Sequence, residues 1–215
     1  MVCSVALHRE GELITNQIHQ VEKSHSSLLP GIALNICEEA GYAFKDLDAV
    51  AVSSGPGSYT GLRIGASNAK GICYTLDKPL IAIPSLDIIA EAVRGKFLGE
   101  HLLCPMMDAR RMEVYLQIED KSGEVIWDLQ PKILTEETFH EFKKPLYLFG
   151  DGMPKFREIS KQENLIFIDD IYPDAVNMGR MALEKYHAQS FEDVAYFEPN
   201  YLKEWRTTTP KKQFQ

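Results

Sequence analysis

A short apolar run, Ala49-Val50-Ala51-Val52, constrains the fold more than any other part of this sequence. Acidic residues precede the run and glycines follow it, which is typical of a strand that is buried on both faces. A tight loop over Ser53–Ser58 then leads into a helical pattern that extends from about Tyr59 to Leu76. A buried strand that is joined by a tight loop to a long helix predicts an α/β fold.

The same alternation of strands and helices continues on both sides of this unit. A hairpin of Val2–Leu7 and Leu13–Ile18 precedes a helix over about 26–40, in which Ser26 is the expected N-cap and Pro30 falls in the first turn. We also expect strands at 79–83, 102–107, 113–118, 124–134, 146–149 and 165–168, and helices at 85–93, 135–142, 154–162 and 174–188. Two similar halves predict two lobes, residues 1–98 and 99–215, which meet in a glycine-containing stretch.

Composition and charge argue against several classes of protein. Hydrophobic residues make up 45% of the chain and charged residues 25%, the balance of an ordinary globular protein. The formal net charge of −8 disfavours a free-standing RNA-binding module, which usually presents a basic face. The chain lacks a run of about eighteen apolar residues that would predict a membrane span, and its scattered cysteines fit reducing conditions. We therefore expect a cytoplasmic protein without membrane contact.

The sequence lacks the common patterns of metal and catalytic sites. The six histidines are scattered, the four cysteines are far apart, and there is no G-x-S-x-G motif of a hydrolase. We expect no tightly bound metal or other cofactor. The charged turn Asp108–Glu113 has two interpretations: Arg110 and Arg111 contact a phosphate or a partner, or the turn is a solvated hairpin.

Gly55, Gly57 and Ser58 lie where a strand gives way to the N-terminus of a helix. Free backbone N–H groups and the helix dipole make such a place suited to a nucleotide or another anion. The spacing matches neither a P-loop nor the dinucleotide-binding fingerprint. The alternative therefore stays open that these glycines only supply a tight turn with positive φ.

The helix after this loop has two distinct faces. One stripe should pack on the sheet and consists of Leu62, Gly65, Ala66, Ala69, Ile72, Cys73 and Leu76. The other stripe consists of Arg63, Ser67, Lys70 and Tyr74, bordered by Ile64 and Gly71. Small residues let another helix approach closely, and the pattern alone leaves open whether that helix belongs to this chain or to another subunit.

The segment S-G-P-G-S-Y-T-G-L-R-I-G, residues 54–65, resembles the signature of the TsaB family of tRNA threonylcarbamoyladenosine biosynthesis subunits. The resemblance covers nearly the whole chain and extends to His25–Pro30, Asp46–Asp48, Pro84–Asp87, Asp108–Tyr115 and Pro199–Leu202. It implies a two-lobed actin-like, Hsp70-like ATPase (ASKHA) fold.

The resemblance also implies a function. It implies a non-catalytic subunit that binds and activates the catalytic sister TsaD, together with the ATPase TsaE, and that meets tRNA only through the complex. It leaves open a homodimer, and ATP or ADP bound within the complex. The family pairs through the helices that match 26–40 and 60–76. The implied interface residues are Leu28, Leu29, Ile32, Ile36, Arg63, Ile64, Ser67, Lys70, Gly71 and Tyr74.

Two departures from the family pattern bear on these expectations. TsaD carries a metal-binding H-x-x-x-H where this chain has Ser85-Leu86-Asp87-Ile88-Ile89, without either histidine. This difference separates a pseudo-enzyme from the alternative, a metal-dependent carbamoyltransferase or ATPase-type enzyme that acts on its own. Family members also begin with a strand before the segment that matches Cys3–Leu7, so we expect the first strand of the lobe to be missing and a sheet edge to be unpaired.

Overall fold

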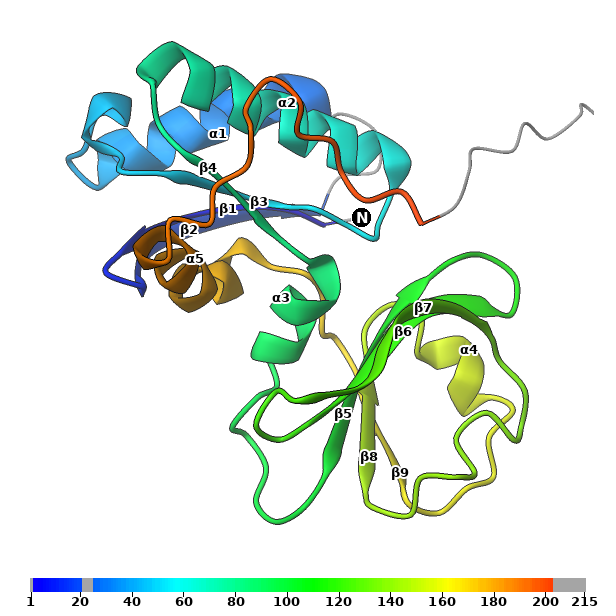
Figure 1. Ribbon diagram of the computed structural model, residues 1–215. Helices are drawn as coiled ribbons and strands as arrows, with labels where there is room; N and C mark the ends of the chain where they lie inside the picture. Colours follow the sequence, from blue (N-terminus) through cyan, green and yellow to red (C-terminus); the bar gives the residue numbers. More distant parts are fainter. Residues whose placement is uncertain (1, 21–24, 203–215) are drawn as a thin grey trace, which may run out of the picture.

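The computed structural model describes residues 2–20 and 25–202, in which strands and helices alternate along the chain (Figure 1). The elements are β1 (Val2–Arg9), β2 (Glu12–Gln20), α1 (His25–Glu39), η1 (Phe44–Asp46), β3 (Val50–Ser53), α2 (Tyr59–Leu76), β4 (Leu80–Ile83), α3 (Ser85–Glu91), β5 (Leu102–Asp108), β6 (Glu113–Asp120), β7 (Val125–Ile133), β8 (Leu146–Phe149), α4 (Pro154–Arg157), β9 (Leu165–Ile168), η2 (Ala175–Met178) and α5 (Gly179–His187). They form two lobes, as the alternation predicts. None of the helices in these described ranges combines the length and hydropathy that a bilayer crossing requires.

The first lobe contains two pairs of strands between two layers of helices. β1 and β2 form an antiparallel hairpin, and β3 and β4 are parallel, with Val50 opposite Leu80 and Ser53 opposite Ile83. α1 packs on β1, α2 packs on β3, and the two helices contact each other. η2 and α5 cover the opposite side of the strands (Figure 1). This double cover is why β4, which is fully buried, consists only of Leu80-Ile81-Ala82-Ile83.

The second lobe is built on a five-stranded sheet in the order β7-β6-β5-β8-β9. β5, β6 and β7 are antiparallel, whereas β8 and β9 run parallel to β5. Side chains alternate between the faces of a strand, so Cys104 and Met106 enter one apolar cluster while Leu103 and Met107 enter another. The central strand is therefore buried on both faces.

The lobes are not two consecutive stretches of chain. After β9 the chain returns to the first lobe, where Met178 packs with Ile81 and Ile83 (Figure 1). Further along, Glu192 forms an antiparallel bridge with Leu80, and Phe197 joins the apolar cluster beneath α2. The division at 98/99 thus marks only the connection from α3 to β5, because the chain from η2 onward lies on the lobe that the sequence assigned to residues 1–98.

Four helices differ from those that the sequence predicts. The helix expected at 154–162 is reduced to α4, which ends at Arg157. α1 begins at His25, so Ser26 lies inside the helix and Pro30 lies beyond the first turn. The helix expected at 135–142 is a series of turns. The helix expected at 174–188 is divided into η2 and α5, although Asp174 does cap it by accepting a hydrogen bond from the Val176 N–H at 3.1 Å.

β3 has one strand partner among the described residues and therefore one open edge. The N–H of Val50 donates to the Pro79 carbonyl at 3.0 Å, and the N–H of Ser54 donates to the Ile83 carbonyl at 2.9 Å. Since alternate residues of a parallel strand direct their N–H groups to the same neighbour, the amides of Ala51 and Ser53 point away from β4.

We expect the amides of Ala51 and Ser53 to exchange their hydrogens about tenfold or more faster than that of Val52, because neither has a ladder partner among the described residues. Residue-resolved hydrogen exchange under native conditions measures this difference. Leu103 and Cys104 in β5, whose amides point to opposite neighbours and which both have a strand partner, serve as controls that should both exchange slowly. Equal protection of Ala51 and Val52 would contradict the expectation and would mean that a further group covers this edge.

Candidate functional site

α2 presents a row of exposed residues to solvent, called here the outer face of α2: Arg63, Ser67, Gly71 and Tyr74. Their spacing of three and four residues places them on one side of the helix. Leu62, Ala66, Ala69 and Cys73 are buried on the other side. Tyr74 is 85% exposed, which leaves a large aromatic side chain in water. The two faces that the sequence pattern predicts for this helix are therefore present.

The buried side of α2 also determines the protonation state of its cysteine, Cys73. Cys73 is buried beneath α2, and burial raises the pKa of its thiol to about 11. The thiol therefore stays neutral at physiological pH and acts as a small apolar group. Cys37 is likewise buried, in the cluster beneath α1. The interpretation of both residues as core thiols agrees with the structure.

A groove of about 430 Å³ lies beside the outer face of α2. It is lined by Phe44, Ser67, Asn68, Gly71, Ile72, Thr75 and Leu76. Gly71 is one of these residues, and a Cβ added there would meet no atom of the described part of the chain within 4 Å. The groove thus combines small and apolar residues with an open approach, which suits a side chain inserted from another molecule.

Two residues predicted for the interface belong instead to the core. Ile32 and Ile36 of α1 are buried in a cluster with Leu7 and Cys37, against β1. Their periodic spacing shows that α1 has an apolar face, but that face packs on the strands of its own lobe. The prediction of Ile32 and Ile36 as partner contacts is therefore corrected. The exposed part of α1 includes Leu34, which is not among the predicted interface residues.

The remaining predicted interface residues differ in how accessible they are. Ile64 and Leu29 are half-buried, and the side chain of Leu28 lies outside the described part of the structure. The ammonium group of Lys70 donates to the carbonyls of Ala195 and Phe197, each at 3.0 Å. Lys70 thus anchors the returning C-terminal segment beside α2.

The glycine-rich loop before α2 is largely committed to packing. Gly55 has φ +102, and an added Cβ would lie 2.8 Å from the Asn200 carbonyl oxygen. Its own carbonyl accepts a hydrogen bond from the Ser85 N–H at 2.9 Å. Gly57 is exposed, and the hydroxyl of Ser58 accepts from the Gly61 N–H as the N-cap of α2. The positive φ and close approach of Gly55 fit the tight-turn interpretation, while anion contact by Gly57 and Ser58 stays a prediction.

The charged turn between β5 and β6 is held from within. The Lys155 ammonium donates to Asp108 Oδ1 at 2.6 Å, to the Arg111 carbonyl at 2.7 Å and to the Glu113 carbonyl at 2.9 Å. Arg110 and Arg111 are exposed and both have positive φ. The turn is therefore an ordered hairpin with two arginines at its surface.

The stretch that would correspond to the metal-binding histidines of TsaD is buried. Ser85 is 2% exposed, and its Oγ lies 2.7 Å from Oγ of Ser53. Ile89 is fully buried in the cluster that joins α3 to the second lobe. Among the described residues, no three His, Cys, Asp or Glu side chains are grouped so that they could hold a metal ion.

Comparison with known proteins places this geometry in context. The model of the family TsaD, tRNA N6-adenosine threonylcarbamoyltransferase, matches residues 11–204. The tRNA threonylcarbamoyladenosine biosynthesis protein TsaB of Bacillus subtilis is 37% identical over 111 residues, which cover 52% of this chain and 47% of that protein. The TsaB protein of Escherichia coli is 27% identical over 209 residues, which cover 94% of this chain and 90% of that protein.

The fold is also similar to that of a solved structure. A Pseudomonas aeruginosa protein, described as uncharacterized and similar to the peptidase YeaZ, has a TM-score of 0.79 and 25% sequence identity. The match covers 94% of each chain. Together with the match to the family model, this likeness confirms the predicted two-lobed ASKHA fold.

Proposed function

Because this chain belongs to the TsaD family and its near full-length relatives are TsaB proteins, we propose that it is a non-catalytic subunit of the tRNA threonylcarbamoyladenosine machinery. In this proposal it acts in the cytoplasm by binding the catalytic sister TsaD, and the ATPase TsaE works with the resulting complex. The tRNA is then held by the complex rather than by this subunit alone.

The observation that carries the proposal is the outer face of α2 with its groove. It is an exposed helix surface with small residues, Ser67 and Gly71, at its centre, with Tyr74 projecting from it and about 430 Å³ of open space beside it. A protruding aromatic residue next to a recess is typical of the buried centre of protein interfaces. The same face would serve a homodimer when TsaD is absent.

The stretch around α3 supports the non-catalytic part of the proposal. Ser85 and Ile89 are buried where the resemblance to TsaD would place metal ligands, and neither side chain is suited to that role. The net charge of −8 supports the view that tRNA is gripped by partners, since phosphate binding requires basic surface. We propose that the chain works without a tightly bound metal and that any ATP or ADP binds within the assembled complex.

Reconstitution tests this function directly. The chain is combined with TsaD and TsaE of the same organism, tRNA, ATP and threonylcarbamoyl-adenylate, and the modified adenosine is measured by mass spectrometry. We expect modification with all the proteins present and only background when this chain is left out. The chain by itself should also give background.

Each omission addresses a different part of the proposal. Modification by this chain alone would contradict the non-catalytic assignment and favour an enzyme in its own right. Full modification without this chain would contradict the subunit assignment. Size measurement by light scattering, with and without TsaD, separates a failure to bind from a failure to activate.

A further inference from the structure

α3 and the turn after it lie between the two lobes and contact both (Figure 1). Leu86, Ile89 and Val93 pack into a cluster with residues of β5 and β8 in the second lobe. On the other side, Ile88 packs with Met178 of η2, which lies on the first lobe. Apolar contacts of this kind are not directional, so by themselves they do not set the angle between the lobes.

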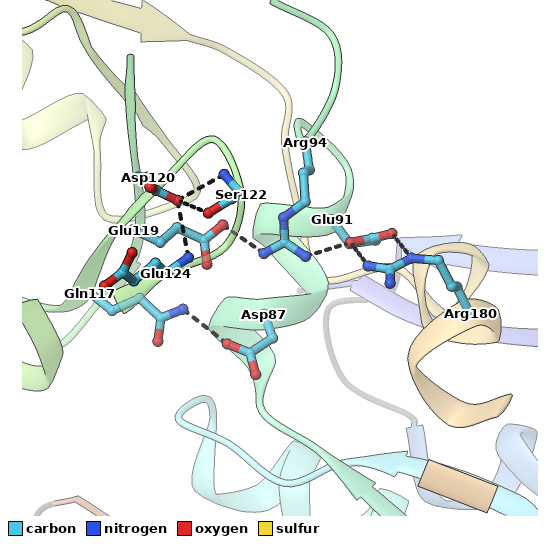
Figure 2. Close-up of polar contacts among 9 residues, drawn as sticks. All are labelled: Asp87, Glu91, Arg94, Gln117, Glu119, Asp120, Ser122, Glu124 and Arg180. Carbon is cyan, nitrogen blue, oxygen red and sulfur yellow. Dashed lines mark hydrogen bonds and ion pairs between the residues drawn. The ribbon is translucent and has the colours of Figure 1, made fainter. Parts of the chain in front are cut away.

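Charged groups add directional contacts at the same place, as Figure 2 shows. Arg180 of α5, on the first lobe, donates from Nε to Glu91 Oε1 at 2.8 Å and from Nη2 to Glu91 Oε2 at 2.7 Å. This bidentate geometry is the most directional form of ion pair. The Arg180 hydrogen bonds, more than any other contact, lower the pKa of Glu91 below its ordinary value.

A second arginine joins Glu91 to the other lobe. Arg94 Nη1 donates to Glu91 Oε2 at 2.8 Å, and Arg94 Nη2 donates to Glu119 Oε1 of β6 at 2.7 Å. The Glu119 side chain is only 3% exposed, so the contact that Arg94 makes with the second lobe is buried. Beside it, Gln117 of β6 donates to Asp87 of α3 at 2.9 Å.

We propose that Arg180, Glu91, Arg94 and Glu119 form an inter-lobe latch that holds the two lobes at one angle. The four groups alternate between acid and base, so each acidic group lies beside an arginine, and Arg180 also pairs with Glu184 of its own helix. Glu91 is the central group of the latch, because Arg94 and Arg180 both pair with it. The latch acts on the shape of the whole subunit and does not depend on the function proposed above.

The latch is tested by measuring the distance between the lobes. Spin labels are placed at Glu38 in α1 and at Lys143 in the second lobe, both exposed, in a Cys3→Ser background. Double electron–electron resonance spectroscopy should give one narrow distribution of the distance between the two labels in the parent protein. We expect Arg180→Met and Glu91→Gln each to widen the distribution about twofold or more. Arg180→Lys should give an intermediate width, since lysine keeps the charge but loses the bidentate geometry.

The matched control is Arg157→Met. Arg157 pairs with Asp169 at 2.9 Å, and both residues belong to the second lobe. Its loss should leave the inter-lobe distance unchanged. The proposal is overturned if Arg180→Met and Glu91→Gln both give the parent distribution, or if Arg157→Met widens it to the same extent. Glu91→Gln preserves the side-chain volume, so the distance distribution of this variant tests the latch even if Arg180→Met does not fold.

Discussion

A Gly71→Trp variant is expected to fold normally and to bind TsaD about 100-fold more weakly, a loss of about 3 kcal/mol. The indole would occupy the groove beside Ile72 and Thr75 and would clash with whatever closes over the outer face of α2. The free subunit is open at this position, since no atom of the described residues lies within 4 Å of an added Cβ. Calorimetry with TsaD measures the affinity, and thermal melting checks the fold.

Ser67 provides a matched pair of substitutions on the same face. Ser67→Trp should weaken binding like Gly71→Trp, whereas Ser67→Ala, which adds no volume, should bind like the parent protein. Both positions are exposed, so neither change disturbs the core of the lobe. Parent-like affinity in both tryptophan variants would rule out this face as the contact with TsaD.

A Gly150→Ala variant is expected to lose about 3 kcal/mol or more of its free energy of unfolding. Gly150 follows β8 with φ +99, and an added Cβ would lie 2.2 Å from the carbonyl oxygen of Met106. That oxygen cannot move away freely, because it accepts a hydrogen bond from the Gly152 N–H at 3.1 Å. The cost therefore combines backbone strain at residue 150 with a clash between the new methyl group and the main chain of β5. Denaturant unfolding measures it.

Gly95→Ala is the control, because it isolates the strain from the clash. Gly95 has φ +77, but within residues 2–20 and 25–202 no atom lies closer than 4 Å to an added Cβ. We expect this variant to lose only about 1 kcal/mol. Equal losses in the two variants would show that the close approach between Gly150 and Met106 has no energetic consequence.

The sequence predicted best where local patterns decide the structure. The strand expected at Ala49–Val52 is β3, displaced by one residue, and the helix expected from Tyr59 to Leu76 is α2. The expected burial of the strand on both faces is wrong, because only Val52 of β3 is buried and the other three residues are half-buried. Both elements depend on signals within a few residues of each other: an apolar run, glycines and helical spacing. Arg63, Ser67 and Tyr74 of the expected stripe are exposed for the same reason. Lys70 was also expected in this stripe, but it is half-buried and bonds to the returning C-terminal segment, and Gly71, expected at the border, completes the exposed row.

The predictions failed where the outcome depends on distant parts of the chain. The spacing of Ile32 and Ile36 shows that α1 has an apolar face, but it cannot show whether that face meets β1 or another protein. The pattern after Asp174 predicts a helix without showing that the helix returns to the first lobe. These choices are set by tertiary packing, which one sequence does not display.

Turns replace the helix that was expected at 135–142. The N–H groups of Thr138, His140 and Phe142 each donate to the carbonyl three residues earlier, and the chain forms successive turns instead of a continuous helix. Phe139 is then fully buried against Trp127 and Phe156, which stabilises the turns.

The return of the chain to the first lobe also sets an order of events on the ribosome. β5 to β9 emerge as one uninterrupted stretch, so the second lobe has its whole sheet as soon as β9 has been synthesised. The first lobe starts earlier and finishes later, because α5, Glu192 and Phe197 are made only near the end of translation. Until then β4, whose four residues are all buried in the finished protein, lacks one of its covering layers. The nascent chain therefore carries an exposed apolar strand through much of its synthesis, the state in which chaperones and aggregation compete for it.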